Sequence, residues 1–285
     1  MKNLWIVFVA IFIFSCKKND GLFNYAIQIN GPGTTHYSQE DYDRLVYLTD
    51  TNTVKNIADV KSHMNEMTVI LCKYHDRVGA FTVLYNAITN DAYNVLSVQV
   101  SPHIEESRRF MTEFANHYLR SFHNYLLGKP IEQAWLKYYK DCAATNNTIL
   151  HLGLSGINVH ITYDIPFVLN DMNAKTDFFP EYRQHTDFIA GGYPDAAVDL
   201  QTYYGVQNAG NVFHVFDFGL QIDGVLGEGA TTHAIIDVLR VESRNKSRSL
   251  LTNKLTVPQL ETALFKSFSD REGLIDALQK EDMLY

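Results

Sequence analysis

One apolar stretch decides the fold: residues 146–171 read NNTILHLGLSGINVHITYDIPFVLND. It is the longest apolar run outside the N-terminus, and its length and composition predict a buried helix. At about 100° per residue, His160 and Asp164 fall within about 40° of each other. Asp171 returns to within about 20° of that line if Pro166 does not turn the axis far. Because polar side chains inside an apolar helix are costly unless each is paired, this polar stripe is the main functional clue.

Most of the remaining chain also has helical periodicity, because apolar side chains recur at three- and four-residue spacing. Alternating strand patterns are rare, and the best candidate, Asn94–Val100, can also be the end of the helix before it. The sequence therefore predicts an all-α protein, with a single multi-helix domain of eight to ten helices over residues 38–285. The helical patterns lie at 38–67, 76–89, 104–127, 130–139, 178–189, 195–222 and 231–251, followed by two closing helices.

Several helix ends are marked by capping residues. Ser38 begins the first helix, and Asn146 or Asn147 caps the apolar helix. The segments 256–259 (TVPQ) and 269–272 (SDRE) match the capping-box pattern and predict the starts of the two closing helices.

The N-terminus predicts export. Residues 1–15 contain one positive charge at Lys2 and an apolar run too short to span a bilayer, which is typical of a signal peptide. The following Cys16 completes a segment, IFSC, that resembles a bacterial lipoprotein cleavage box, and residues 17–20 (KKND) resemble the start of many Bacteroidetes lipoproteins. This resemblance implies a lipid anchor on Cys16, a tether over residues 16–37, and a place in the bacterial cell envelope at the outer membrane. The alternative is an uncleaved hydrophobic anchor.

Composition excludes some partners. A formal net charge of −8 argues against nucleic-acid binding, which needs a basic surface. The basic residues between Arg240 and Arg248 fit a solvated helix end that complements the helix dipole. Cys72 and Cys142 either pair or remain free thiols, since both lie in apolar helical sequence and the chain has no Cys-x-x-Cys motif.

Two His-x-x-x-Asp pairs, His160/Asp164 and His233/Asp237, are candidate metal ligands. At this spacing both side chains of a pair project from one helix face, and imidazole nitrogen with carboxylate oxygen suits zinc or another divalent transition metal. Two such pairs on facing helices would form a four-ligand or two-metal site. The alternative for each pair is a hydrogen bond that organises the core, with no cofactor. His151 lies about 180° from His160 and is expected to pack or cap.

Other polar residues lie near these pairs in the predicted fold. Arg77 opens an apolar helix and either pairs with a core Asp or neutralises an anion. Asn158 is a candidate to orient a neighbouring segment, and Asp187 or His185 to approach the site from another helix.

The segment Gly156–Pro166 resembles the signature helix of an uncharacterised bacterial family, an all-helical domain of unknown function. The resemblance extends to Asp76–Arg77, to Trp135 and to Asp187–Phe188, and covers roughly residues 70–250. It implies that these polar positions belong to a family motif, and it implies no activity. A looser similarity links the His and Asp spacing to zinc-dependent phospholipase C and related nucleases, which are also helical and exported.

Two functions fit these patterns. The first is metal-assisted hydrolysis of an ester or phosphoester by a lipid-anchored protein with a buried His/Asp site. The second is a non-enzymatic envelope lipoprotein that binds a small molecule or an envelope partner, and whose polar stripe is structural.

Overall fold

The computed structural model describes residues 36–207, 209–210, 225, 230–281 and 283–284. With α7, η3 and α8 counted as one continuous helix, these residues form nine α-helices and no strand, which confirms the all-α prediction. The predicted signal segment, Cys16 and nearly all of the tether lie outside the described residues. The α-helices are α2 (Gln39–Thr49), α3 (Ile57–Lys73), α4 (Gly79–Val98), α5 (Ile104–Leu126), α6 (Gln133–Ala143), α7 (Ile149–Val159), α8 (Ile165–Asp171), α9 (Phe179–Tyr204), α12 (Ala230–Leu251) and α13 (Val257–Lys280).

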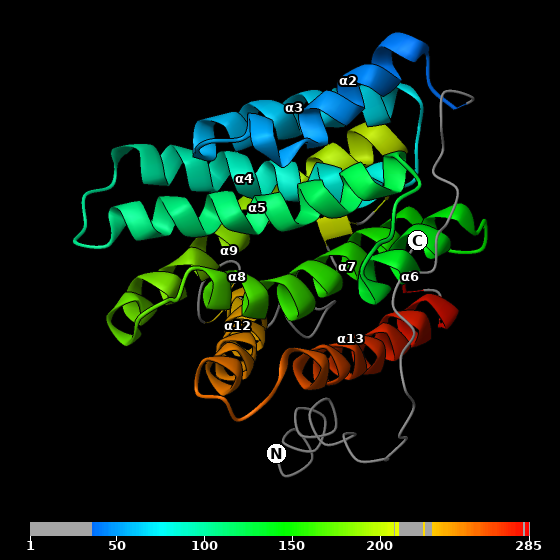
Figure 1. Cartoon of the computed structure of the whole chain (residues 1–285). Coiled ribbons are helices and arrows are strands. Elements are labelled where there is room, and N and C mark those ends of the chain that lie inside the picture. The colour runs from blue at the N-terminus through cyan, green and yellow to red at the C-terminus, as the bar shows by residue number, and fades with distance from the viewer. Residues whose placement is uncertain (1–35, 208, 211–224, 226–229, 282, 285) are drawn as a thin grey trace.

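The helices pack in layers (Figure 1). Helices α2 and α3 form one outer layer, α4 and α5 lie beneath it, and α6 to α8 follow. Helices α12 and α13 cover the opposite side, and α9 packs along α4. The apolar stretch that begins near residue 146 therefore lies inside the molecule, between α4 and the two C-terminal helices. Among the described residues, none of the helices combines the length and apolar character needed to cross a membrane.

Two glycine contacts explain how closely these helices approach. A Cβ atom on Gly156 of α7 would lie 2.4 Å from Cβ of Phe81 on α4. A Cβ atom on Gly192 of α9 would lie 2.9 Å from the backbone of Ile88, also on α4. Both distances are shorter than real side chains tolerate, so the space beside Gly156 is filled by α4.

Several predicted helix boundaries differ from the observed ones. Residues 94–98 continue α4, so the strand alternative is wrong, and Thr148 rather than either Asn caps α7. Helix α9 runs through Pro194 to Tyr204 instead of ending near residue 191. Helix α13 is continuous, so the segment 269–272 starts no helix, whereas the capping box at Thr256 is confirmed. The predicted helical segment 211–222 lies outside the described residues.

The core is rich in aromatic side chains. Trp135, Tyr118, Tyr138 and Tyr139 are all fully buried, and they pack with Phe81 at the junction of α4, α5 and α6. Cys72 and Cys142 are both buried free thiols, with no disulfide between them.

Candidate functional site

The apolar stretch changes helical geometry at its centre. Residues His160–Asp164 form one π-helical segment, η3, between α7 and α8. Pro166 has no N–H for the carbonyl four residues earlier and its ring crowds that carbonyl, so a widened turn relieves the clash. The hydroxyl of Ser243 on α12 donates to the carbonyl of Ile161, at 2.9 Å, and satisfies an acceptor in this turn.

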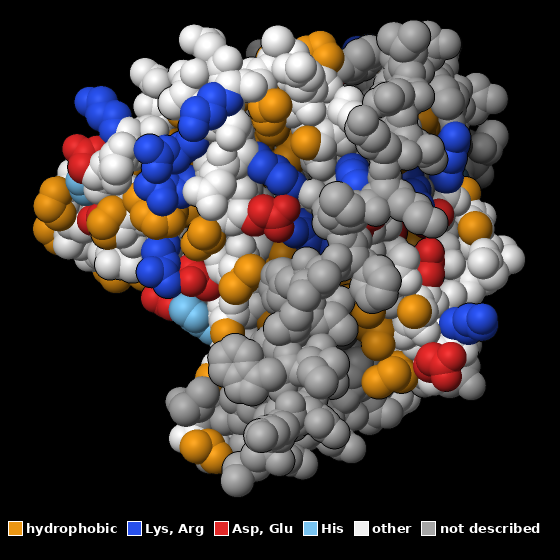
Figure 2. All heavy atoms as spheres, turned by 90° about the horizontal axis from the view of Figure 1, so that it is seen from below, with side chains coloured by type: hydrophobic (Ala, Val, Ile, Leu, Met, Phe, Trp, Pro, Cys, Tyr) orange, Lys and Arg blue, Asp and Glu red, His pale blue; other side chains and the backbone are white. Residues whose placement is uncertain are grey.

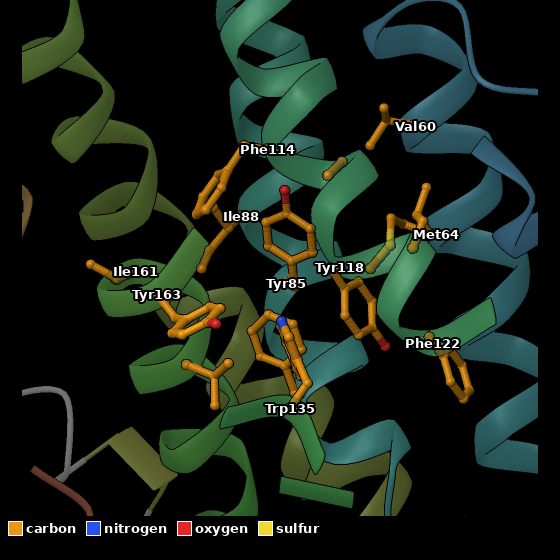
Figure 3. Packing of buried hydrophobic residues seen from close by; sticks show 14 of the residues in the cluster. Val60, Met64, Tyr85, Ile88, Phe114, Tyr118, Phe122, Trp135, Ile161 and Tyr163 are labelled. Atoms are coloured by element: carbon orange, nitrogen blue, oxygen red, sulfur yellow. The ribbon is translucent and has the colours of Figure 1, made fainter. Parts of the chain in front are cut away.

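The His160 ring lies in an aromatic enclosure. It stacks on Phe114 with ring centroids 3.6 Å apart and planes 6° apart, and the edge of Tyr85 is 4.5 Å away. Figure 3 shows Phe114, Tyr85 and Trp135 grouped in this region beside the η3 residues Ile161 and Tyr163. Only 2% of His160 is exposed, so the imidazole has no access to bulk solvent.

The polar end of His160 is paired within the core. Its Nδ1 lies 2.7 Å from Oδ2 of Asp164, and the indole N–H of Trp135 donates to both oxygens of that carboxylate at 3.2 Å. Burial lowers the pKa of His160, which favours the neutral ring with Nδ1–H donated to Asp164. Nε2 is buried without a hydrogen-bond partner among the described residues. The predicted pairing of His160 with Asp164 is thus present, with Trp135 as a third member.

The two predicted metal-ligand pairs do not converge. His233 and Asp237 lie on α12, but His233 Nε2 pairs with Asp187 at 2.8 Å, and Asp237 pairs with Arg183. Among the described residues, neither pair belongs to a group of three potential ligands. Asp187 therefore does approach another predicted ligand, on an exposed surface, while His160 and Asp164 remain a separate buried pair.

Three other predicted positions have different surroundings from those expected. Asp171 is exposed and pairs with His117 at 3.7 Å, and it makes no contact with His160 among those of the described residues. Arg77 pairs with no carboxylate of the described residues: it donates to three backbone carbonyls at the end of α6 and in the following loop. His185 is buried, with Nε2 3.0 Å from the hydroxyl of Ser107.

A second polar cluster lies where α6, α7 and α13 meet. Asp141 lies in the last turn of α6, His151 lies in the first turn of α7, and Glu272 lies in the middle of α13. One potential ligand atom from each lies within 4.8 Å of the others. His151 and Glu272 are each 1% exposed, so the cluster holds one imidazole and one carboxylate in the interior.

Neighbouring side chains fix Glu272. The hydroxyl of Ser155 donates to Oε2 at 2.8 Å, and the amide of Asn158 donates to Oε1 at 2.7 Å. The same amide donates to the carbonyl of Phe268 at 3.1 Å, so Asn158 does orient a neighbouring segment. Burial raises the pKa of Glu272, and these hydrogen bonds and the charge of Lys137 oppose that shift.

His151 is buried but incompletely paired. Its Nε2 lies 3.7 Å from Oδ1 of Asp276, and its Nδ1 has no hydrogen-bond partner among the described residues. Burial lowers the pKa of His151, so the neutral form is favoured. Neutral imidazole with a free ring nitrogen is the state in which histidine binds a metal ion or accepts a proton.

A cavity of about 660 Å³ opens beside this cluster. Lys137 and Asp141 line it and form an ion pair, and the ammonium of Lys137 lies 3.9 Å from Glu272. The α6–α7 loop forms another part of the wall, held by Arg77 on one side and by Gln279 on the other. Gln279 accepts from the N–H of Thr148 at 2.8 Å. The cluster thus places buried titratable groups beside an open polar pocket, and Asp141 is the cluster member that lines it.

The family described as Family of unknown function (DUF5995) matches residues 57–202. The chain belongs to this family. No curated protein and no solved structure matches the chain. The match confirms the resemblance to an uncharacterised helical family. The DUF5995 match contains Asp141, His151, His160 and Asp164, whereas Glu272 follows it in the chain.

Sequence reasoning missed two members of this cluster, Asp141 and Glu272. Glu272 stands three positions after Ser269, in a pattern typical of a capping box, but α13 passes through this segment without a break. One signal was available: Glu272 lies on an apolar helix face, eight residues after Leu264 and four after Phe268, and all three are buried.

Proposed function

We propose that this DUF5995 protein binds a divalent transition metal at Asp141, His151 and Glu272 and uses it to hydrolyse an ester or phosphoester. The observation that carries the proposal is the convergence of three ligand atoms within 4.8 Å beside a cavity. Three protein ligands with one position left for water is the usual arrangement of a catalytic zinc site.

The donor set suits such an ion. One imidazole nitrogen and two carboxylate oxygens match zinc and similar borderline cations. Nδ1 of buried His151 has no hydrogen-bond partner among the described residues, so the ring has a nitrogen available to bind an ion. Lys137 balances the carboxylates, and because it also lines the cavity, its side chain has room to turn outward when an ion replaces its charge.

The chain's own residues supply the rest of the chemistry. A bound ion lowers the pKa of water and polarises an ester or phosphoester oxygen. Ser155 and Asn158 hold the Glu272 carboxylate in place, as the outer partners of metal ligands do. Lys137 and Lys280 line the cavity together with Asp141 and Asp276, so an anionic substrate there would contact the two ammonium groups.

We further propose that the protein is exported and lipid-anchored at Cys16, which would place this site in the cell envelope. The signal-like segment 1–15 and the cleavage box support this. Labelling cells with a palmitate analogue tests it: the wild-type chain takes up the label, and Cys16→Ser abolishes uptake. Equal labelling of both chains would contradict lipidation at this cysteine.

A second candidate is a non-enzymatic binding module. The enclosure of His160 and Asp164 among aromatic rings favours a structural role for that pair. In a non-enzymatic binding module, the Asp141 cluster would also be structural, and Lys137 already forms an ion pair with Asp141 there.

Zinc titration of the purified, metal-stripped protein separates the two candidates. We expect about one equivalent of bound zinc, with affinity reduced at least about tenfold by His151→Ala, and zinc-dependent hydrolysis of a chromogenic phosphoester or ester. His233→Ala is the matched control, because His233 also lies beside a carboxylate. Less than a tenth of an equivalent would overturn the metal site, and zinc binding without any hydrolysis would favour the binding module.

A further inference from the structure

A second, smaller pocket lies on another part of the molecule. It has a volume of about 230 Å³ and lies between the C-terminal half of α12 and the turn that leads into α9. Figure 2 shows Lys and Arg side chains gathered on the same side of the molecule as α12 in Figure 1. The lining residues are Leu169, Asn173, Ala174, Lys175, Thr176, Phe178, Phe179, Tyr182, Arg244, Ser247, Arg248, Leu251 and Thr252.

The charged side chains that line this pocket are all positive. Lys175, Arg244 and Arg248 line it, and no Asp or Glu is among the lining residues. Within the described part of the chain, no ion pair involves any of these three side chains. Burial and the neighbouring charge of Arg248 lower the pKa of Arg244. Three cations without anionic partners, one of them half-buried, form a region of unbalanced positive potential.

The guanidinium of Arg244 is held in position. It lies over the ring of Phe179 with its central carbon 3.2 Å from the ring centroid, so its planar face is covered by an aromatic group. Stacking of this kind leaves the edge of the guanidinium, with its N–H donors, free to bind an oxyanion.

Helix electrostatics do not explain this arrangement. Basic residues in the last turn of a helix stabilise its dipole, and this accounts for Arg248, close to the end of α12 at Leu251. Arg244 stands seven positions before that end, beyond the turn in which the effect operates.

A buried hydroxyl points to a missing partner in the pocket. Ser247 is 1% exposed and lines the pocket, and its Oγ has no hydrogen-bond partner among the described residues. Buried hydroxyls are nearly always hydrogen-bonded, so an unsatisfied one requires an explanation. An oxyanion bound between Arg244 and Arg248 would accept a hydrogen bond from this hydroxyl.

We propose that this pocket binds a phosphate group, carried either by a small phosphorylated molecule or by a phospholipid headgroup. Arginine pairs with phosphate through two parallel hydrogen bonds, and Ser247 adds a third donor. Phe178, Phe179 and Leu251 provide apolar surface for the part of the ligand that bears the phosphate. The site is separate from the Asp141 cluster and independent of any metal.

Calorimetric titration with inorganic phosphate in the presence of a chelator tests the site without involving the metal. We expect binding that weakens with salt, and a loss of about tenfold or more in affinity for Arg244→Gln. Arg248→Gln serves as a second variant, because Arg248 is exposed and its replacement leaves packing intact. Arg183→Gln is the matched control, since Arg183 is an exposed arginine outside the pocket.

Vesicles distinguish the two sources of phosphate. Binding to phosphatidylglycerol vesicles that Arg244→Gln and Arg248→Gln abolish would identify a phospholipid headgroup. Binding of free phosphate without vesicle binding would identify a small phosphorylated molecule. Unchanged affinity for both probes in these two variants, or no binding of either probe by the wild-type protein, would overturn the proposal.

Discussion

Replacement of His160 by alanine is expected to destabilise the fold without affecting metal binding. The variant leaves Oδ2 of the buried Asp164 without its donor at 2.7 Å, and only Trp135 remains to bond the carboxylate. Truncating a fully buried ring of this size leaves a cavity and an unsatisfied carboxylate oxygen, and together these cost about 3–5 kcal/mol. At about 2–4 °C per kcal/mol for a domain of this size, the melting temperature should fall by about 6–20 °C.

Urea denaturation followed by circular dichroism measures this loss, and zinc titration of the same sample measures metal binding. The control His233→Ala removes an exposed imidazole and should change the free energy of unfolding by no more than about 0.5 kcal/mol. The double variant His160→Ala/Asp164→Ala should cost less than the sum of the two single variants, because each removes the other's partner.

One result would refute this reasoning. If His160→Ala lost less than about 1 kcal/mol of stability but abolished zinc binding, the pair would be a ligand site and the enclosing aromatic rings would have to open. Retained zinc binding with reduced stability would exclude His160 as a ligand and is the result expected for a metal at Asp141, His151 and Glu272.

Three further predictions follow from other contacts. Burial holds the pKa of His185 well below its ordinary value of 6.5, so below about pH 6.5 the unfolded chain binds one more proton than the folded chain. The free energy of unfolding should therefore decrease by about 1.4 kcal/mol for each pH unit by which the pH is lowered below 6.5. His185→Gln should flatten this dependence, measured by urea denaturation at several pH values. Gly156→Ala would place a Cβ 2.4 Å from Phe81 and should lower stability by about 1–3 kcal/mol, measured by thermal denaturation; an unchanged melting temperature would show that α4 and α7 can separate freely. Arg77→Gln removes donors from three carbonyls around the α6–α7 loop and should cost at least about 2 kcal/mol, with faster amide exchange in residues 144–148; exchange equal to wild type would show that Gln279 alone holds the loop.

Helical periodicity was sufficient to predict the fold class, because each helix buries an apolar face. The boundaries were less accurate where tertiary contacts outweigh local signals. Pro194 and the glycines at 191 and 192 are typical of a helix end, but α9 continues through them. Packing of Gly192 directly against the backbone of Ile88 accounts for this, since the small residue lets α9 lie against α4.

The spacing of His160 and Asp164 correctly predicted their contact, because residues four apart still share a face in η3. Asp171 was expected near the line of His160 only for a regular helix through Pro166, and η3 interrupts that regularity. A π-turn inserts about one extra residue, which rotates later positions by about 100° relative to a regular α-helix. Asp171 therefore leaves the line of His160 and faces His117 at the surface.

The Asp141 cluster could not be predicted from spacing, since its members come from three helices and are separated by up to 131 positions in the chain. His151 was interpreted as a packed residue, and it is buried, but the sequence offers no way to pair it with Glu272. Asn158 gave the nearest signal: it was a candidate to orient a neighbouring segment, and its amide donates to Glu272 on α13.

The contact of Trp135 with Asp164 also makes the core visible to spectroscopy. The chain contains two tryptophans, and the other, Trp5, lies in the predicted signal segment. If that segment is removed, Trp135 is the single indole emitter of the mature protein, and its N–H is bound to the carboxylate that pairs with His160. Fluorescence from this one group would then report the protonation of His160 and the opening of its aromatic enclosure, with no label attached.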